Sequence, residues 1–287
     1  MRKEKKKAKV IISAVILLSV TLLAVKVFMS LRNSFFRIVE RPIFVLTTGS
    51  LDVFVFSFQG KEGLFLNFAK KEPVSATRGF GAYELGKIYS LGELDKKGGE
   101  LLSETMQNNF YMPIFGYFYD KSGYDYKKAS VKEGIFYIFK QSLKGAIKTN
   151  LNKTDLLILL WRSRKIDGSM TKTREYQGEI ADFFKDRNLR KESLAIEVLN
   201  STGHFGLAQK VSFLLENAGA RVVRNADADE KIEKCLLIYR SDCLGKYSLL
   251  WLAETFGCDQ QFNPDAGRAD VSLIIGEQYW QMLNEKW

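Results

Sequence analysis

Few residues in this chain of 287 residues could carry acid–base or metal chemistry. His204 is the only histidine, so paired-histidine zinc motifs are excluded, and a Ser-His-Asp site would have to use this residue. A histidine in a surface loop is the simpler interpretation. The stretch from Asp227 to Glu230 begins like a calcium loop, but Ile232 and Ile238 stand where such a loop needs glycine and glutamate. No G-x-x-x-x-G-K-S/T phosphate loop occurs. We therefore expect no metal site and no cofactor.

The turn around His204 is the candidate binding loop. A strand is expected before it and a helix after it, so the turn presents backbone N–H groups at a helix N-terminus, where anions bind readily. Glycines that only let the chain turn and pack closely are the simpler alternative. The candidate binding residues are Asn200, Thr202, Gly203, His204 and Gly206.

Three cysteines, Cys235, Cys243 and Cys258, lie near the C-terminus, and none forms a C-x-x-C pair. Cys235 opens an expected strand, and the helix that follows should run back across the sheet, which brings Cys258 to the same end. Our hypothesis is a Cys235–Cys258 disulfide with Cys243 free. Three small buried thiols remain an equally open alternative.

The N-terminus combines a basic tail with an apolar run. Residues 1–9 hold six lysines and arginines against one glutamate, which is +5 of the formal net charge of +10. Residues 10–29 contain only four polar side chains, and a helix of about twenty residues crosses the hydrocarbon core of a bilayer. The basic residues are denser before the run than after it, which predicts a cytoplasmic N-terminus. A cleaved signal peptide is the alternative, but residues 27–32 make a poor cleavage site.

The sequence thus predicts a single-pass cell-membrane protein with its folded mass outside the cytoplasm and the lipid bilayer as its partner through residues 10–29. The remaining +5 of net charge is spread along the chain. No basic patch on a docking element is evident, so we expect no nucleic-acid partner.

Hydrophobic periodicity predicts an α/β (α+β) protein with two folded domains. In residues 42–170, a mixed α/β domain, we expect a buried hairpin over 53–58 and 64–68, a strand over 114–119, and helices over 98–109, 131–146 and 153–164. Residues 171–192 are charged and weakly periodic, so we expect a solvated helix or linker. In residues 193–287 we expect strands over 194–199, 220–224, 235–239 and 271–275, with helices over 205–218 and 246–256. That pattern predicts a two-layer sandwich of ferredoxin-like order.

The C-terminal domain resembles the C-terminal domain of LytR-type cell-envelope proteins. Seventeen positions fall on that pattern, and Ser201 replaces its first glycine. These positions are Val198, Leu199, Asn200, Thr202, Gly203, Gly206, Leu207, Ala208, Leu215, Gly219, Val222, Ile238, Tyr239, Ala269, Asp270, Val271 and Gly276. The resemblance implies a bacterial module found outside the cytoplasm.

The middle domain resembles the LytR-CpsA-Psr catalytic domain, which transfers glycopolymers from polyprenyl-pyrophosphate carriers to peptidoglycan. The similarity covers residues 50–55, 98–102, 113–116 and 148–156, with Asp52 at the place of the family's opening aspartate. At residues 67–73, however, no arginine–aspartate pair stands where the family has one. Bidentate arginines and a magnesium-binding carboxylate are what pyrophosphate chemistry needs.

We therefore interpret the middle domain as a degenerate relative. The expected function is non-catalytic binding or scaffolding in cell-wall biogenesis, with peptidoglycan or an envelope glycopolymer as the ligand that the resemblance implies. The alternative is an active glycopolymer phosphotransferase, in which Asp52 would be catalytic.

Overall fold

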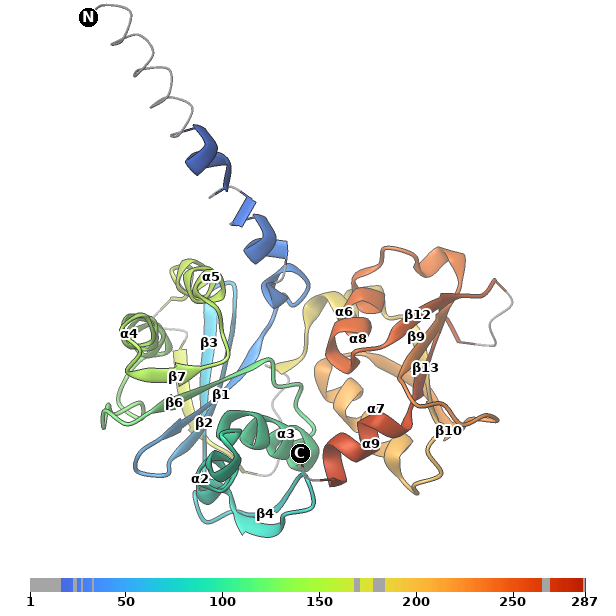
Figure 1. The fold of residues 1–287 in the computed structure, drawn as a ribbon, viewed down its shortest axis with the longest axis horizontal. Helices are drawn as coiled ribbons and strands as arrows, with labels where there is room; N and C mark the ends of the chain where they lie inside the picture. Colours follow the sequence, from blue (N-terminus) through green and yellow to red (C-terminus); the bar gives the residue numbers. More distant parts are fainter. Residues whose placement is uncertain are drawn as a thin grey trace, which may run out of the picture.

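The computed structural model describes residues 17–22, 25–26, 28–32, 34–167, 171–177, 184–264, 269–285 and 287. Two lobes with separate sheets follow each other along the chain (Figure 1), and we call residues 34–177 the middle lobe and residues 184–287 the C-terminal lobe. The expected basic tail, residues 1–9, lies outside the described residues.

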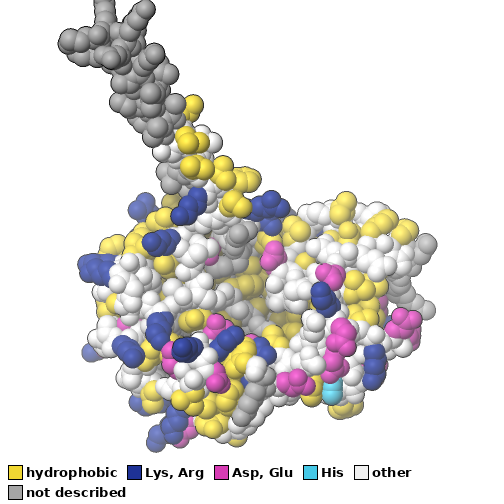
Figure 2. All heavy atoms as spheres, in the orientation of Figure 1, with side chains coloured by type: hydrophobic (Ala, Val, Ile, Leu, Met, Phe, Trp, Pro, Cys, Tyr) yellow, Lys and Arg dark blue, Asp and Glu magenta, His cyan; other side chains and the backbone are white. Residues whose placement is uncertain are grey.

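The expected membrane span, residues 10–29, is described only in part. Residues 17–22, 25–26 and 28–32 are helical. Their apolar side chains are exposed, as Figure 2 shows above the two lobes, from Leu31 at 45% to Leu17 at 69%. Within the described ranges, no helix has both the length and the apolar character needed to cross a membrane.

A six-stranded sheet forms the centre of the middle lobe, with the strand order β7-β6-β1-β2-β3-β8. Its strands are β1 (Ile43–Thr48), β2 (Val53–Gln59), β3 (Glu62–Phe68), β6 (Gly116–Asp120), β7 (Ile147–Thr149) and β8 (Thr171–Glu175). The predicted hairpin is confirmed, because β2 and β3 pair antiparallel from Val53↔Phe68 to Gln59↔Glu62. A small hairpin of β4 (Pro73–Ala76) and β5 (Gly81–Glu84) lies outside this sheet.

Helices cover both faces of this sheet. Along β2, Val53 and Val55 pack into one cluster with α2 (Ile88–Gly92) and α3 (Gly98–Phe110). Phe54, Phe56 and Phe58 pack into the opposite cluster with α4 (Val131–Leu143) and α5 (Lys153–Ser163). Every residue of β2 is buried, as expected for a strand that is covered on both faces.

The expected helices and the strand near residue 116 are confirmed with small shifts of their ends. Asn152 is the N-cap of α5. The Asn152 Oδ1 atom accepts the Asp155 N–H at 2.9 Å. Short 3₁₀ turns occur at η1 (Phe35–Arg37), η2 (Leu85–Lys87) and η3 (Glu93–Asp95).

The prediction of a solvated helix or linker over residues 171–192 is wrong for residues 171–175, which form a strand. Strand β8 pairs parallel with β3, from Gly63↔Thr171 to Asn67↔Glu175, and so extends the middle sheet. A short helix, α6 (Arg187–Glu192), follows, and residues 178–183 lie outside the described residues. The sequence of β8 is charged and shows no apolar alternation, so it does not indicate a strand. An edge strand needs backbone partners but no apolar face.

The C-terminal lobe has a five-stranded sheet in the order β10-β9-β13-β11-β12. Its strands are β9 (Ala195–Asn200), β10 (Arg221–Asp227), β11 (Leu236–Tyr239), β12 (Asp259–Phe262) and β13 (Val271–Ile275). Its helices are α7 (Leu207–Ala218), α8 (Tyr247–Phe256) and α9 (Glu277–Asn284), with a 3₁₀ turn at η6 (Ser241–Cys243).

The expected ferredoxin-like order is wrong. Helix α7 joins β9 to its parallel neighbour β10, and α8 joins β11 to its parallel neighbour β12. A ferredoxin-like crossover would instead skip a strand. Strand β12 escaped prediction because all four of its residues, from Asp259 to Phe262, are exposed and polar up to the last, so they show no alternation.

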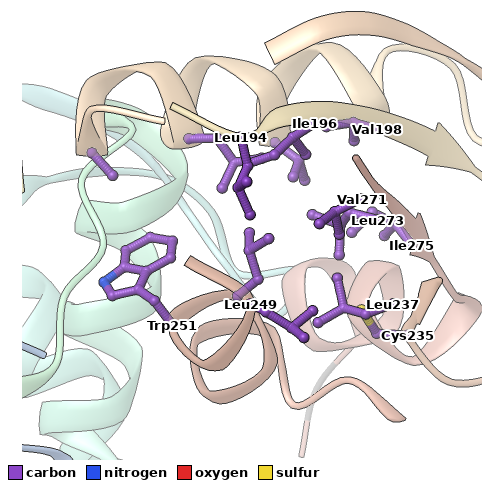
Figure 3. Packing of buried hydrophobic residues seen from close by; sticks show 14 of the residues in the cluster. Leu194, Ile196, Val198, Cys235, Leu237, Leu249, Trp251, Val271, Leu273 and Ile275 are labelled. Atoms are coloured by element: carbon purple, nitrogen blue, oxygen red, sulfur yellow. The ribbon is translucent and has the colours of Figure 1, made fainter. Parts of the chain in front are cut away.

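The core of the C-terminal lobe lies between the central strands and the helices α7 and α8 (Figure 3). Leu194, Ile196 and Val198 come from β9 and the residues before it, and Val271, Leu273 and Ile275 come from β13. Trp251 of α8 is 1% exposed, and its ring lies 6.2 Å from that of Phe115 in the middle lobe. The core therefore continues into the contact between the lobes.

Polar contacts also join the lobes. The Arg78 backbone N–H donates to the Leu283 carbonyl at 2.7 Å, and the Asn217 amide donates to the Tyr111 carbonyl at 3.1 Å. The Tyr247 hydroxyl accepts the Glu40 N–H and donates to Asp186. Burial, reinforced by Asp186, raises the pKa of Tyr247, so the hydroxyl stays protonated and keeps this contact.

Candidate functional site

Asp52 lies at the edge where β1 and β6 end. The two strands run parallel, with Thr48 opposite Asp120, and the carboxyl ends of parallel strands commonly carry binding sites. The Ser50 hydroxyl donates to Asp52 Oδ2 at 2.7 Å, and the Lys127 ammonium lies 3.3 Å from Asp52 Oδ1. Both carboxylate oxygens therefore already have protein partners.

Asp120 is the second carboxylate at this edge, and it is 1% exposed. It accepts the backbone N–H and the hydroxyl of Ser122, at 2.8 and 2.9 Å, and the hydroxyl of Tyr126 at 2.8 Å. Burial and the neighbouring Asp120 raise the pKa of Tyr126, so its hydroxyl remains a donor. These bonds give Asp120 the role of fixing the loop after β6.

The segment that lacks the arginine–aspartate pair lies beside Asp52. Residues 67–73 lead from β3 into β4 through a turn, in which the Glu72 N–H donates to the Ala69 carbonyl. The Lys70 ammonium in this turn lies 3.4 Å from the Ser50 carbonyl oxygen. Lysine supplies a point charge without the planar fork of an arginine. The segment where the resembling family has an arginine thus holds two lysines, Lys70 and Lys71, and no arginine.

We define the β1–β6 edge as Ser50, Asp52, Lys70, Asp120 and Lys127. Its carboxylates do not fit a magnesium ion as ligands. Asp52 is paired with the Lys127 ammonium group, and Asp120 accepts three hydrogen bonds. Among the described residues, no three His, Cys, Asp or Glu side chains lie close enough together to hold a metal ion. The two lysines can attract an anion.

The Gly98-Gly99 pair at the start of α3 serves packing. A Cβ atom on Gly99 would lie 2.1 Å from the Tyr117 ring, and one on Gly98 would lie 2.6 Å from the Tyr89 carbonyl oxygen. Near this helix start, Lys148 pairs with Glu93 at 2.6 Å. The hydrogen bond from Lys148, aided by one from Tyr89, holds the pKa of Glu93 below its usual value.

The predicted binding loop is held largely by its own side chains. Asn200 and Thr202 are 3% and 4% exposed. The Asn200 Oδ1 atom accepts the N–H and hydroxyl of Thr202, while its Nδ2 donates to the His204 carbonyl at 3.0 Å. Gly203 and Gly206 have φ angles of 77° and 81°, which only glycine adopts at little cost. Four of the five candidates therefore shape the loop.

His204, the fifth candidate, lines a cavity of about 300 Å³ between the lobes. Its ring stacks on Trp280 with centroids 3.7 Å apart, and its Nε2 lies 3.0 Å from Glu277 Oε1. Asn108 of α3 and Asn284 of α9 also line the cavity, as does Phe205, which is fully exposed. Sequence reasoning missed this cavity because it needs α9, a helix that was not predicted.

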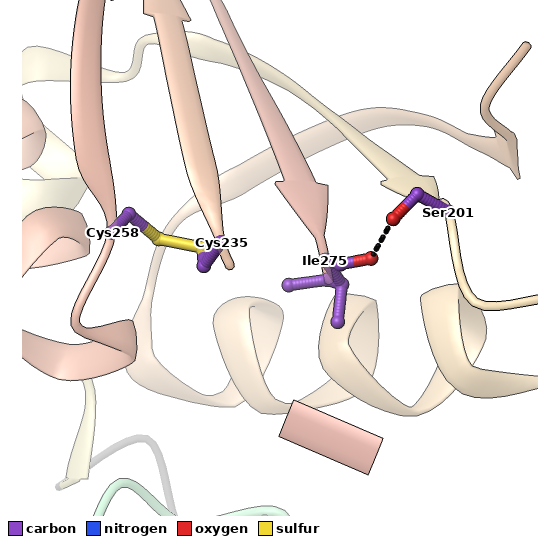
Figure 4. The surroundings of a disulfide bond; sticks show 4 residues. All are labelled: Ser201, Cys235, Cys258 and Ile275. Atoms are coloured by element: carbon purple, nitrogen blue, oxygen red, sulfur yellow. Dashed lines mark hydrogen bonds between the residues drawn. A yellow bond between two sulfur atoms is a disulfide. The ribbon is translucent and has the colours of Figure 1, made fainter. Parts of the chain in front are cut away.

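Cys235 and Cys258 form a disulfide, as our sequence hypothesis paired them, with their Cα atoms 4.5 Å apart. The two residues directly precede β11 and β12, which pair in parallel from Leu236↔Asp259. Figure 4 shows the bridge near the end of β13, where the Ser201 hydroxyl donates to the Ile275 carbonyl at 2.7 Å. The bridge therefore lies at the same end of the sheet as the loop around His204 and supports it. Cys243 is free and buried.

Comparison with known proteins identifies a family domain in the C-terminal lobe. Residues 193–279 match a family model described as LytR cell envelope-related transcriptional attenuator. No curated protein matches the sequence. The C-terminal lobe therefore contains the domain that this model describes. It belongs to the LytR C-terminal family, and the resemblance seen in the sequence is confirmed for this lobe.

Solved structures show weaker likeness. TagV from B. subtilis is 13% identical, with 63% of this chain and 98% of that chain covered and a TM-score of 0.37. A transcriptional regulator from Enterococcus faecalis is 12% identical, with 63% and 89% covered and a TM-score of 0.38. TagU from B. subtilis is 9% identical, with 48% and 84% covered and a TM-score of 0.33.

Proposed function

We propose that this chain is a membrane-anchored, extracytoplasmic protein of bacterial cell-envelope biogenesis that binds an anionic envelope ligand without transferring it. The LytR-type C-terminal lobe supports the envelope role. The exposed apolar side chains between Leu17 and Leu31 support the anchor, because burial in a bilayer would remove them from water. The basic tail supports a cytoplasmic N-terminus.

The observation that carries the binding role is the pairing of Asp52 with Lys127 and Ser50 at the β1–β6 edge. A transferase acting on pyrophosphate would use this aspartate to hold a metal ion, but here an ammonium group stands against it. Lys70 and Lys127 give the edge two cationic groups for a phosphate-bearing ligand, such as a polyprenyl-pyrophosphate carrier or an anionic glycopolymer.

The second candidate function is a glycopolymer phosphotransferase. One observation favours it: the Asp52 side chain is 26% exposed, so solvent and a ligand can reach it. In that case the ion pair with Lys127 would have to open when a metal–substrate complex binds.

A binding experiment tests the proposed ligand site. The full chain in lipid nanodiscs is titrated with a fluorescent polyprenyl-pyrophosphate glycan, and the variant K70Q/K127Q is compared with K231Q/K234Q. The latter removes two exposed lysines of the C-terminal lobe. Exposed ion pairs contribute about 0.2–1 kcal/mol each, so the loss of two lysines should raise Kd about 2- to 30-fold for K70Q/K127Q alone. An equal loss in both variants, or in neither, would contradict the site.

A further inference from the structure

Two helices of the middle lobe expose basic and apolar side chains at the same spacing along each helix. On α4 and its C-cap the residues at positions i, i+4, i+8, i+11 and i+12 are Lys132, Phe136, Lys140, Leu143 and Lys144. On α5 and the two residues after it, the same spacing gives Lys153, Leu157, Trp161, Arg164 and Lys165. All ten side chains are exposed, and this spacing places each set on one side of its helix.

The apolar members of this pattern are unusually accessible. Phe136, Leu143, Leu157 and Trp161 are 57%, 49%, 56% and 59% exposed. The two helices pack side by side against the same face of the sheet. Figure 2 shows basic and hydrophobic side chains mixed on this side of the middle lobe, next to the N-terminal helical residues. We call these ten residues the α4–α5 face.

The end of the N-terminal helical segment and the residues that follow it bind directly to α5. The Ser30 hydroxyl bonds to the Thr154 hydroxyl, and the Ser34 hydroxyl donates to Asp155. The Arg162 guanidinium donates to the carbonyls of Phe36 and Glu40 at 2.9 and 3.1 Å. Any surface that receives the apolar N-terminal residues therefore also lies close to α5.

Beside these contacts, a groove of about 730 Å³ lies between the N-terminal residues and α5. Its walls are mainly apolar, from Phe28, Leu31, Phe36, Ile158 and Trp161. Arg32 and Arg37 also line the groove and are exposed. An apolar wall with cationic groups at its border has the chemistry of a site for an anionic lipid.

We propose that the α4–α5 face and this groove dock on the surface of a bilayer that contains anionic phospholipids. Trp161, Leu157, Phe136 and Leu143 enter the headgroup region, where aromatic and aliphatic side chains of interfacial helices reside. The six basic residues of the face pair with lipid phosphates. The proposal rests on the proposed anchoring, which brings this face to the bilayer.

Charge favours a bilayer over a second copy of this chain as the occupant. A two-fold interface would place the same surface of each copy against the other. Six cationic side chains would then face six more, and like charges across an interface oppose binding. An anionic bilayer surface attracts the same six groups.

Quenching by brominated phospholipids tests the docking. The full chain is reconstituted in vesicles of brominated phosphatidylcholine with or without phosphatidylglycerol, and tryptophan emission is recorded. The contribution of Trp161 is obtained by difference from the W161F variant. The other three tryptophans belong to the C-terminal lobe, where Trp251 is buried and Trp280 stacks on His204. We expect strong Trp161 quenching only with phosphatidylglycerol, and its loss at high salt.

A matched pair of variants separates charge from general effects. K140Q/K144Q removes two lysines of the face and should shift the equilibrium between docked and undocked lobes about 10- to 30-fold toward undocked. That shift is read from the salt concentration at half-maximal quenching. K231Q/K234Q, with two lysines removed from the C-terminal lobe, should leave it unchanged.

Three results would overturn the docking. A chain that floats with vesicles but shows no Trp161 quenching has an anchor without a docked face. A Trp161 emission that shifts with protein concentration, and not with lipid charge, would assign the face to a second copy of the chain. Failure to float with vesicles would refute the proposed anchoring, and the docking with it.

Discussion

Removal of the Cys235–Cys258 disulfide gives the most quantitative prediction for the C-terminal lobe. The bond joins residues 23 positions apart and restricts the unfolded chain more than the folded one. The chain-entropy relation for a loop of this length gives about 3.4 kcal/mol at 25 °C. We therefore expect the variant C235A/C258A to lose about 3.4 kcal/mol in the free energy of unfolding of this lobe.

Hydrogen exchange measures this loss in the C-terminal sheet alone. Amides of β11 and β13 that exchange only when the lobe opens should exchange about 300-fold faster in C235A/C258A, since about 1.4 kcal/mol corresponds to a factor of ten. Treatment of the wild-type chain with a reductant should produce the same acceleration. Amides of β2 in the middle lobe provide an internal reference.

The third cysteine supplies the control. Burial raises the pKa of the Cys243 thiol, so it reacts slowly, and C243A should keep the full response to reductant. C235A/C258A should show no response. The reasoning is refuted if the double variant exchanges at the wild-type rate, or if reductant still accelerates exchange in it.

Three further predictions concern single side chains. Burial alone would raise the pKa of Glu192, but its hydrogen bonds at the start of α8 outweigh burial and hold the pKa below its usual value. The stability that Glu192 supplies is thus present above the unfolded pKa and lost as pH falls through the folded pKa. Glu192→Gln should therefore cost about 1 kcal/mol near pH 7 but little in acid. Urea titrations at both pH values measure the difference. Gly99→Ala should cost about 1–3 kcal/mol because its Cβ meets the Tyr117 ring, whereas an unchanged melting temperature would mean that the ring moves aside freely. Arg78→Gln should cost about 2 kcal/mol, because it removes two bonds to Glu104 at 2.8 and 2.7 Å. Burial raises the pKa of Glu104, although Arg78 acts to lower it. The variant should therefore regain stability as pH falls and Glu104 takes up a proton. A second change, Glu104→Gln, should recover part of the loss at pH 7.

Much of the local structure could be predicted because apolar patterns report burial directly. The runs over 53–58 and 64–68 are covered on both faces, and both strands were expected. The N-cap at Asn152 could likewise be read from the sequence, because a cap is a local hydrogen bond. Such features depend only on residues a few positions apart.

The order of the strands could not be predicted in this way. Strands β8 and β12 lie at the edges of their sheets and are held by backbone pairing, so their polar sequences show no apolar period. Without β12, the predicted ferredoxin-like order has the helix after β11 lead directly to β13 and skip a strand on the way. The order β10-β9-β13-β11-β12 followed only from the complete pairing.

The candidate sites were predictable to different degrees. Asp52 could be located through a resemblance, but its pairing with Lys127 joins residues 75 positions apart, and no pattern in the sequence indicates it. The loop at Asn200–Gly206 was predicted as a binding loop. The side chains of Asn200 and Thr202, however, bond to each other and stabilise the loop. The cavity beside His204 depends on α9 packing against the middle lobe, which is a tertiary contact.

One assay tests most directly whether the β1–β6 edge binds without catalysis. The full chain in nanodiscs is incubated with a labelled polyprenyl-pyrophosphate glycan, magnesium and peptidoglycan, and both bound ligand and released carrier phosphate are measured for the wild type and for Asp52→Asn. Our account predicts saturable binding, no release, and tighter binding by Asp52→Asn, because the substitution removes a negative charge and frees Lys127. Release of carrier phosphate by the wild type that Asp52→Asn abolishes would contradict it and establish the phosphotransferase.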